Sequence, residues 1–160
     1  MSEYKLYNVV PSLITFLESL TNWYVRLNRL RLKGESDDLS WNVSLNVLFD
    51  VLMKVNVLMS PIVPFLTESM YQNLRKVLRK DSKLNQESIH HVFISEVNVK
   101  LLNETITEKM KDVMSIIETS RKLRENKKIS LKQPIMQLTI VNKSQSFFDH
   151  LTPFLSYIEE

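Results

Sequence analysis

Four cations crowd into residues 20–34 of this chain, a stretch that reads LTNWYVRLNRLRLKG. No acidic residue lies between Glu18 and Glu35, and an Asn-Trp-Tyr run precedes the cations. Guanidinium groups bind phosphate oxygens in a bidentate way, and aromatic rings stack on unpaired bases. The residue types and their spacing therefore suit the binding of RNA.

A single amphipathic helix over residues 12–33 is predicted to position these side chains. Apolar residues recur at steps of three and four along one face, and Pro11 lies near the predicted start. Gly34 suits the left-handed residue that closes such a helix. On an ideal wheel, one stripe opposite the apolar face holds Asn22, Arg26, Arg29 and Lys33.

Three further side chains of this helix fall off that stripe. Trp23 lies on the shoulder between the two faces, Tyr24 lies on the apolar face, and Arg31 projects toward the apolar side. Cations in a last turn also stabilise a helix through its dipole, and the face opposite a core is normally charged. A surface helix built for stability usually mixes charges of both signs. The absence of acidic residues between Glu18 and Glu35 therefore favours RNA binding. The residues alone leave both interpretations open.

A second basic cluster ends the helix that Asn103-Glu104 is expected to open. It comprises Arg121, Lys122, Arg124, Lys127 and Lys128, opposed only by Glu125. This cluster is the second candidate surface for an anionic partner.

Composition excludes several classes of function. The chain has 160 residues, a net charge of +3, no cysteine and one glycine. Thiolate chemistry and cysteine-built zinc sites are therefore excluded, as is a glycine-rich phosphate loop. No apolar run approaches the roughly 20 residues of a membrane span, and no signal peptide is recognisable. We expect a cytoplasmic protein without a membrane segment.

Two histidine-containing stretches are expected to carry no chemistry. Adjacent imidazoles diverge on an extended chain, so His90-His91 is not predicted to bind a metal. Asp149-His150 lies close to serines, but such short spacing on a helix cannot bring a hydrolytic triad together.

The remaining pattern predicts a mainly α fold. A helix is expected over residues 40–59; the run Ser60-Pro61-Ile62-Val63-Pro64 breaks it and starts a further helix that continues to about Lys80. An extended patch at 88–94 is expected to pack on the bundle. Met136, Leu138 and Ile140 alternate with more polar residues and predict a strand. Residues 144–158 read as helix in two pieces, divided at Thr152-Pro153.

We therefore expect two regions. A helical bundle would occupy residues 1–126, followed by a small α/β appendage at residues 127–160. One strand cannot form a stable sheet, so either the predicted strand pairs with a segment that the pattern does not reveal, or the chain is cut before the partner strand. The last residues carry no helix-terminating signal, which favours the cut and an incomplete appendage.

Several stretches resemble one family, in the same order along nearly the whole chain. "LTNWYVRLNRLRLKGE" resembles the opening helix of the anticodon-binding domain of isoleucyl-tRNA synthetases, most closely the eukaryotic cytosolic form. "MSPIVPFLTE" from Met59 and "MYQNLR" from Met70 are similar to the stretches that follow it. Ser88-Ile89-His90 and the segment from Lys127 to Ile135 match later parts. Departures occur at Leu30, Ser60 and Ile135.

The resemblance implies a helical bundle that docks the anticodon arm of isoleucine tRNA, tRNA(Ile). The implied tRNA-binding residues are Asn22, Trp23, Arg26, Arg29, Arg31, Lys33, Arg121, Lys122 and Arg124. ATP and magnesium would act in a separate catalytic domain, so this chain is expected to need no cofactor and to form no aminoacyl-adenylate alone. The implied partners are that catalytic domain, an editing domain and, in eukaryotes, a larger synthetase assembly.

Other functions remain open at this point. The equivalent domain of a valyl- or leucyl-tRNA synthetase would share much of the pattern. A helical protein-interaction module could use the same basic stripe to meet an acidic partner. A basic helix lying on a membrane is disfavoured, because its apolar face is needed by the core.

Overall fold

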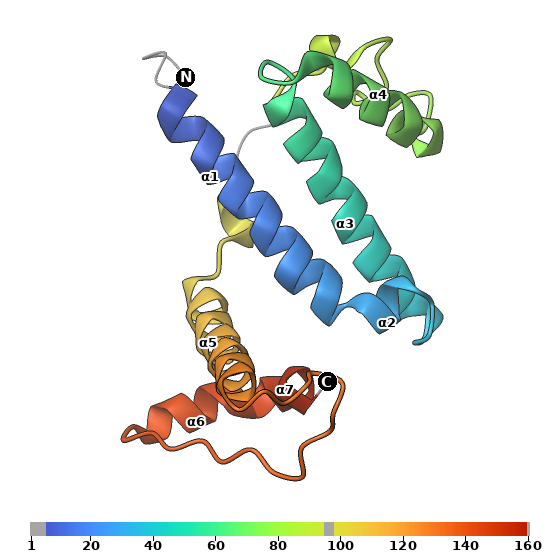
Figure 1. The fold of residues 1–160 in the computed structure, drawn as a ribbon. Helices are drawn as coiled ribbons and strands as arrows, with labels where there is room; N and C mark the ends of the chain where they lie inside the picture. Colours follow the sequence, from blue (N-terminus) through green and yellow to red (C-terminus); the bar gives the residue numbers. More distant parts are fainter. Residues whose placement is uncertain (1–5, 95–97, 160) are drawn as a thin grey trace. The chain divides into compact units, whose positions relative to one another are not determined.

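The computed structural model describes residues 6–94 and 98–159, and the chain divides into two compact units, residues 1–97 and 98–160 (Figure 1). The described residues form helices, turns and irregular segments, with no strand among them. The mainly α fold predicted from the sequence is confirmed. The predicted domain limit after residue 126 stays a prediction.

The first unit begins with a helix that is longer and less regular than predicted. Helix α1 spans Leu6–Ser19, continues as a π-helical segment over Leu20–Val25, and is followed by the short helix α2, Arg29–Leu32. Pro11 lies inside α1 rather than at its start. Its missing amide deprives one carbonyl, that of Tyr7, of a helical donor, and the Tyr7 residue is largely exposed to water.

Asn28 separates α1 and its π-helical continuation from α2. Its backbone leaves the helical region at φ −103° and ψ 17°. The side chain is buried, and its Nδ2 donates to the Tyr24 carbonyl at 2.8 Å while its Oδ1 accepts from Arg31 Nη1 at 2.7 Å. The continuous helix predicted over residues 12–33 is therefore wrong at this point. The Asn28 backbone amide still donates to the Tyr24 carbonyl at 3.1 Å, and the buried Asn28 side chain adds its own bonds to Tyr24 and Arg31, which hold the distorted backbone.

Helix α3, Asp38–Met59, supplies much of the core of the first unit. Asp37 caps it by accepting from the amide of Ser40 at 2.9 Å. Met53 and Val57 pack with Tyr71 and neighbours in the buried cluster. Other apolar side chains of α3 remain exposed, among them Leu45, Val47 and Leu58.

By length and composition alone, α3 could also cross a membrane. The expectation that no segment is apolar enough is corrected on this point. A helix that contributes to the core of a globular domain passes the same test, and α3 places Met53 and Val57 in such a core.

A groove of about 550 Å³ lies between α1 and α3. Its wall is mostly apolar and includes Val9, Leu13, Phe16, Val51, Val55 and Leu58. The first unit thus leaves apolar surface of both helices open to water.

Helix α4, Pro64–Leu74, follows the predicted break and starts with proline at its first turn. It is shorter than predicted, because a 3₁₀ turn over Arg75–Val77 ends it before Lys80. The predicted patch at 88–94 does pack on the core through the buried side chains of Ile89 and Val92. Within this patch Ile89–His91 forms a 3₁₀ turn, and the backbone of Val92 is extended.

The second unit is built on helix α5, Glu104–Asn126, with α6, Gln145–Leu151, and α7, Leu155–Glu159. Asn103 caps α5 by accepting from the amide of Ile106, as the sequence predicted. A 3₁₀ turn over Thr152–Phe154 separates α6 from α7, which confirms the predicted division there.

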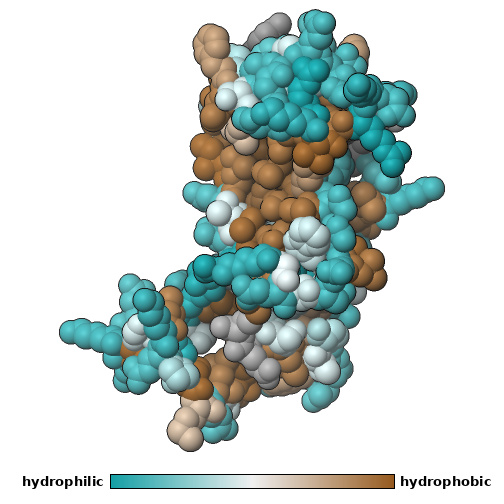
Figure 2. Space-filling view, turned by 90° about the vertical axis from the view of Figure 1, so that its right-hand side faces the viewer, coloured by the Kyte–Doolittle hydropathy of each residue, from teal (hydrophilic) through white to brown (hydrophobic). Residues whose placement is uncertain are grey.

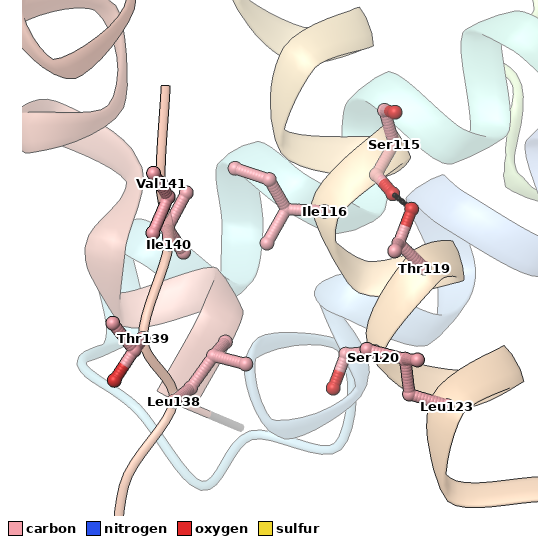
Figure 3. A pocket seen from close by; sticks show the side chains of 9 residues that line it. All are labelled: Ser115, Ile116, Thr119, Ser120, Leu123, Leu138, Thr139, Ile140 and Val141. Carbon is pink, nitrogen blue, oxygen red and sulfur yellow. Dashed lines mark hydrogen bonds between the residues drawn. The ribbon is translucent and has the colours of Figure 1, made fainter. Parts of the chain in front are cut away.

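The predicted strand around Leu138 does not form. Residues 134–142 run as irregular chain, and Leu138–Val141 lie beside α5, where they and residues such as Ile116 and Leu123 line a hollow of about 220 Å³ (Figure 3). Alternation alone cannot make a ladder, because each strand needs a second strand to accept and donate its backbone hydrogen bonds. The appendage is therefore α-helical and irregular among the described residues, not α/β.

Candidate nucleic-acid interface

The basic stripe, defined as Asn22, Arg26, Arg29 and Lys33, is exposed on the first unit. Asn22 belongs to the π-helical segment, Arg26 follows it, and Arg29 opens α2. No ion pair within the described part of the chain involves Arg26 or Arg29. Lys33 lies 3.6 Å from the carboxylate of Glu35, in a pair whose members are each about half exposed. Two guanidinium groups thus remain open to an anionic ligand.

The π-helical segment gives this stripe a geometry that an ideal helix would not. A π turn holds more residues than an α turn, and single π turns within α-helices often occur at functional sites. The segment contains the Asn22-Trp23-Tyr24 run, and the Asn28 break follows three residues after it. The residues of the basic stripe therefore lie on separate short segments and not on one regular helix.

Arg31 is engaged within the chain. Its Nε donates to Ser40 Oγ at 2.7 Å, its Nη2 reaches the Ser40 carbonyl at 3.5 Å, and its Nη1 donates to Asn28 Oδ1. The half-buried guanidinium therefore ties α2 to the start of α3. The helical wheel predicted that Arg31 projects toward the apolar side, but it did not reveal the two neutral partners, Ser40 and Asn28. An asparagine in the middle of a predicted helix was the signal that could have indicated Asn28.

The two aromatic residues of the motif are both half-buried. The hydroxyl of Tyr24 donates to the Ser44 carbonyl on α3 at 2.9 Å. This contact agrees with the predicted inward position of Tyr24. It also anchors the π-helical segment to α3, so the exposed side chains beside it are held by a fixed backbone.

Gly34 ends this region in the left-handed conformation, with φ +78°. Its amide donates to the Arg31 carbonyl at 3.1 Å, and the amide of Glu35 donates to the Leu30 carbonyl at 3.0 Å. This pair of bonds is the Schellman arrangement, which satisfies the last carbonyls of a helix. The predicted role of Gly34 is confirmed.

The second basic cluster ends α5 in the same way. The amides of Lys128 and Ile129 donate to the carbonyls of Glu125 and Arg124, both at 2.9 Å. Here the left-handed residue is Lys128, at φ 55°, the only described non-glycine residue with positive φ. A side chain at such a position costs free energy that glycine avoids.

The members of the second cluster differ in exposure. Lys122 is exposed, whereas Arg121 and Arg124 are half-buried. Arg124 Nη1 donates to the carbonyls of Ser130 and Leu131, at 3.4 and 3.2 Å, and so holds the chain that leaves α5. Arg124 therefore has a structural role in addition to any contact with a ligand.

Glu68 joins two motifs that lie apart in the sequence, the stretch from Met59 and Ser88-Ile89-His90. Its Oε2 accepts from Ser88 Oγ at 2.8 Å and from the Ile89 amide at 2.9 Å, while its Oε1 accepts from Gln72 Nε2 at 2.6 Å. These bonds lower the pKa of the carboxyl, the Gln72 bond most, against an opposing effect of desolvation. The motif residues around Glu68 and Ser88 thus form one structural joint.

A family model described as the anticodon-binding domain of tRNA ligase matches residues 1–141. The chain therefore belongs to the anticodon-binding domains of tRNA ligases.

Three of the most similar relatives are isoleucine--tRNA ligases. The whole chain is 53% identical to an isoleucine--tRNA ligase of Tetrahymena thermophila and 39% identical to a probable cytoplasmic isoleucine--tRNA ligase of Dictyostelium discoideum. A cytoplasmic isoleucine--tRNA ligase of Schizosaccharomyces pombe is 37% identical over the full length of the chain. The chain spans 15% of the length of each of these relatives.

Proposed function

We propose that this chain is the part of an isoleucyl-tRNA synthetase that docks the anticodon arm of tRNA(Ile). The observation that carries the proposal is the pair Arg26 and Arg29, exposed without an ion pair in the described residues, on a segment fixed by Tyr24 and Asn28. Full-length similarity to isoleucine--tRNA ligases favours this function over a valyl or leucyl sibling.

The site residues take different roles in this proposal. Arg26, Arg29 and Lys33 contact backbone phosphates, and Asn22 and Trp23 fix the segment or touch nucleotides. Arg31 adds positive charge while it holds α2 against α3. A second surface on the other unit comprises Arg121, Lys122 and Arg124.

The longer protein would supply the chemistry. We assign the ATP- and magnesium-dependent ligation of isoleucine, and editing, to parts of such a synthetase outside this segment. Among the described residues, no three His, Cys, Asp or Glu side chains gather where they could hold a metal ion. Several relatives are named as cytoplasmic, which supports a cytoplasmic location. A larger synthetase assembly is a further proposed partner.

A binding experiment tests this function. The chain is titrated with tRNA(Ile), with the same tRNA carrying a different anticodon, and with a tRNA for another amino acid, over a series of salt concentrations. We expect tRNA(Ile) to bind tightest and the preference to disappear with the anticodon swap. The double variant Arg26→Ala/Arg29→Ala should weaken binding at least tenfold and reduce the salt slope by roughly 1.5, the value for about two phosphate contacts.

The matched control removes two other exposed cations, as Lys54→Ala/Lys111→Ala, and should bind as the parent chain does. Equal losses in both double variants would mean that only net charge matters. Absence of binding at low salt would overturn the proposed function, and binding of an acidic protein that excess tRNA does not displace would assign the chain to protein interaction instead.

A further inference from the structure

A third group of cations lies on the first unit, at the end of α4 and in the loop after it. Residues 75–83 contain five cations and one acid, Asp81. Four of the cations are exposed and will be called the α4-loop surface: Lys76, Arg79, Lys80 and Lys83. Figure 2 shows hydrophilic side chains gathered over the upper part of the face it displays, at the height where Figure 1 places α4.

The backbone of this loop is fixed to the core. Tyr71 is fully buried, and its hydroxyl lies within hydrogen-bond distance of the carbonyls of Leu84 and Gln86, at 2.7 and 2.9 Å. The same hydroxyl accepts from the Gln86 amide at 2.7 Å. Leu78 and Leu84 pack against the buried cluster on either side of Arg79, Lys80 and Lys83, and Lys76 lies just before Leu78 in the 3₁₀ turn that follows α4. Because both ends are anchored inward, the residues between them face solvent in a defined conformation.

The fifth cation shows how the loop is built. Arg75 is half-buried, lies over the Tyr71 ring at 5.9 Å, and donates to the Glu87 carbonyl at 3.0 Å. Its charge is used to hold the loop. By contrast, no ion pair within the described residues involves any of the four cations of the α4-loop surface. Lys76 donates only to a neutral oxygen, Asn73 Oδ1, at 3.1 Å.

We propose that the α4-loop surface is a second contact of the first unit with the RNA backbone, separate from the basic stripe. This inference rests on the proposed function and adds a site to it. Clustered cations without acidic partners, on a backbone held in place, suit an array of phosphates. No aromatic residue lies among residues 75–83. The surface therefore offers no ring that could stack on an unpaired base, and its cations would contact phosphates.

An acidic protein partner fits this surface less well. Protein interfaces are depleted in lysine and have an apolar centre. Three of the four exposed cations here are lysines, and the single exposed large apolar side chain among residues 75–83 is Val77. RNA is the occupant that the composition favours.

The test uses a quadruple variant in which Lys76, Arg79, Lys80 and Lys83 are each changed to Gln. Its matched control changes four other exposed lysines to Gln: Lys54, Lys100, Lys111 and Lys143. Affinity for tRNA(Ile) and for its anticodon-swapped form is measured over a salt series, and circular dichroism melting verifies that both variants fold. We expect the loop variant to bind both RNAs at least tenfold more weakly, with an unchanged ratio between them and a salt slope reduced by roughly 2 to 3.

A footprint on the unaltered chain tests the same point without substitutions. Acetylation of lysines, followed by mass spectrometry, should show Lys76, Lys80 and Lys83 protected by tRNA, and Lys54 and Lys111 unprotected. If the parent chain binds tRNA while the loop variant matches its control and the lysines stay reactive, the α4-loop inference fails and the proposed function stands. If the parent chain binds no tRNA, both fail. Polyglutamate that protects these lysines as well as tRNA does, at equal salt, would assign the surface to an acidic protein.

Discussion

Glu68 and Asn28 are polar side chains that each connect two segments of the first unit. Glu68 joins α4 to the turn at Ser88 and Ile89, and Asn28 joins the π-helical segment to Arg31 on α2. Each one satisfies backbone or guanidinium groups that would otherwise lack partners in a partly buried site. The positions of the exposed cations therefore depend on residues that need not touch a ligand.

We predict that Glu68→Gln lowers the free energy of unfolding by about 1 kcal/mol at neutral pH, because an ionised acceptor of three hydrogen bonds is replaced by a neutral amide. The fold lowers the pKa of this carboxyl below its ordinary value of 4.5. Its contribution is thus complete above that value and is lost as the pH falls through the lower folded pKa. Urea unfolding of both chains at pH 7 and in acid measures the difference, which should shrink in acid.

The control for this prediction is Asp50→Asn, which breaks the exposed pair between Asp50 and Lys54. Such pairs contribute little, so its effect should stay below about 0.5 kcal/mol. A Glu68 effect as small as the control, or one that persists unchanged in acid, would show that the charge of Glu68 does not support the joint.

At the scale of single residues, the sequence predicted backbone conformations and side-chain directions better than hydrogen-bond partners. The left-handed Gly34 and the inward Tyr24 followed from local rules about glycine and about helical faces. The hydrogen bonds from Arg31 to Asn28 and Ser40 could not be predicted from those rules. Three residues of the interpretation, Arg26, Arg29 and Lys33, are exposed as expected, and their contact with RNA remains a prediction.

At the scale of elements, two basic helix ends share one closing arrangement but use different residues. The end near Gly34 has the residue type that the left-handed conformation prefers, and the end of α5 has Lys128 instead. The same hydrogen bonds stabilise both ends. The pair therefore gives an internal comparison of what the left-handed residue contributes.

We predict opposite effects of substitution at these two ends. Gly34→Ala should lower the free energy of unfolding by about 1 kcal/mol, since a Cβ there would meet only Trp41 ring atoms at 3.9–4.0 Å and the cost arises from the backbone. Lys128→Gly should raise it by up to about 1 kcal/mol. Chemical denaturation of the two variants measures both. Changes of the same sign would contradict the shared role of these residues.

The boundaries of the elements were predictable where a residue type fixes them. Asn103 as a cap, Pro64 at the start of α4 and Pro153 between α6 and α7 all act through local backbone chemistry. The π-helical segment was not predicted, because a helical wheel assigns every residue the same 100° rotation and so assumes a regular α-helix from the start. The strand at residues 136–140 was wrongly predicted because alternation does not reveal whether a partner strand exists.

At the scale of the whole molecule, the groove between α1 and α3 is open because the chain does not cover the apolar faces of these two helices completely. Its wall is mostly apolar, and its volume is about 550 Å³. The chain spans 15% of the length of the relatives reported above. Regular amphipathic patterns predicted which residues of these helices are apolar, but they could not predict which of them the chain itself covers.

We predict that the folded chain binds the dye ANS at this groove. Phe16, which lines the groove and is 46% exposed, should be important for that binding, so Phe16→Ser should lower dye fluorescence several-fold. The matched control is Phe65→Ser, since Phe65 is 91% exposed and is not part of the groove wall. Titration under native conditions measures both. Equal fluorescence from the two variants would place the dye elsewhere.

The joint at Glu68 and the buried hydroxyl of Tyr71 together hold α4 to residues 84–89. They clamp both ends of the segment from Lys76 to Lys83, and Leu78 within it also packs against the buried cluster, so residues 79–83 are the stretch that the core does not use. Lengthening a clamped segment adds an entropic cost that grows only with the logarithm of its length. In evolutionary terms, insertions and deletions at this place would leave the core intact, so the reach of the α4-loop surface can diverge between species faster than the fold that carries it.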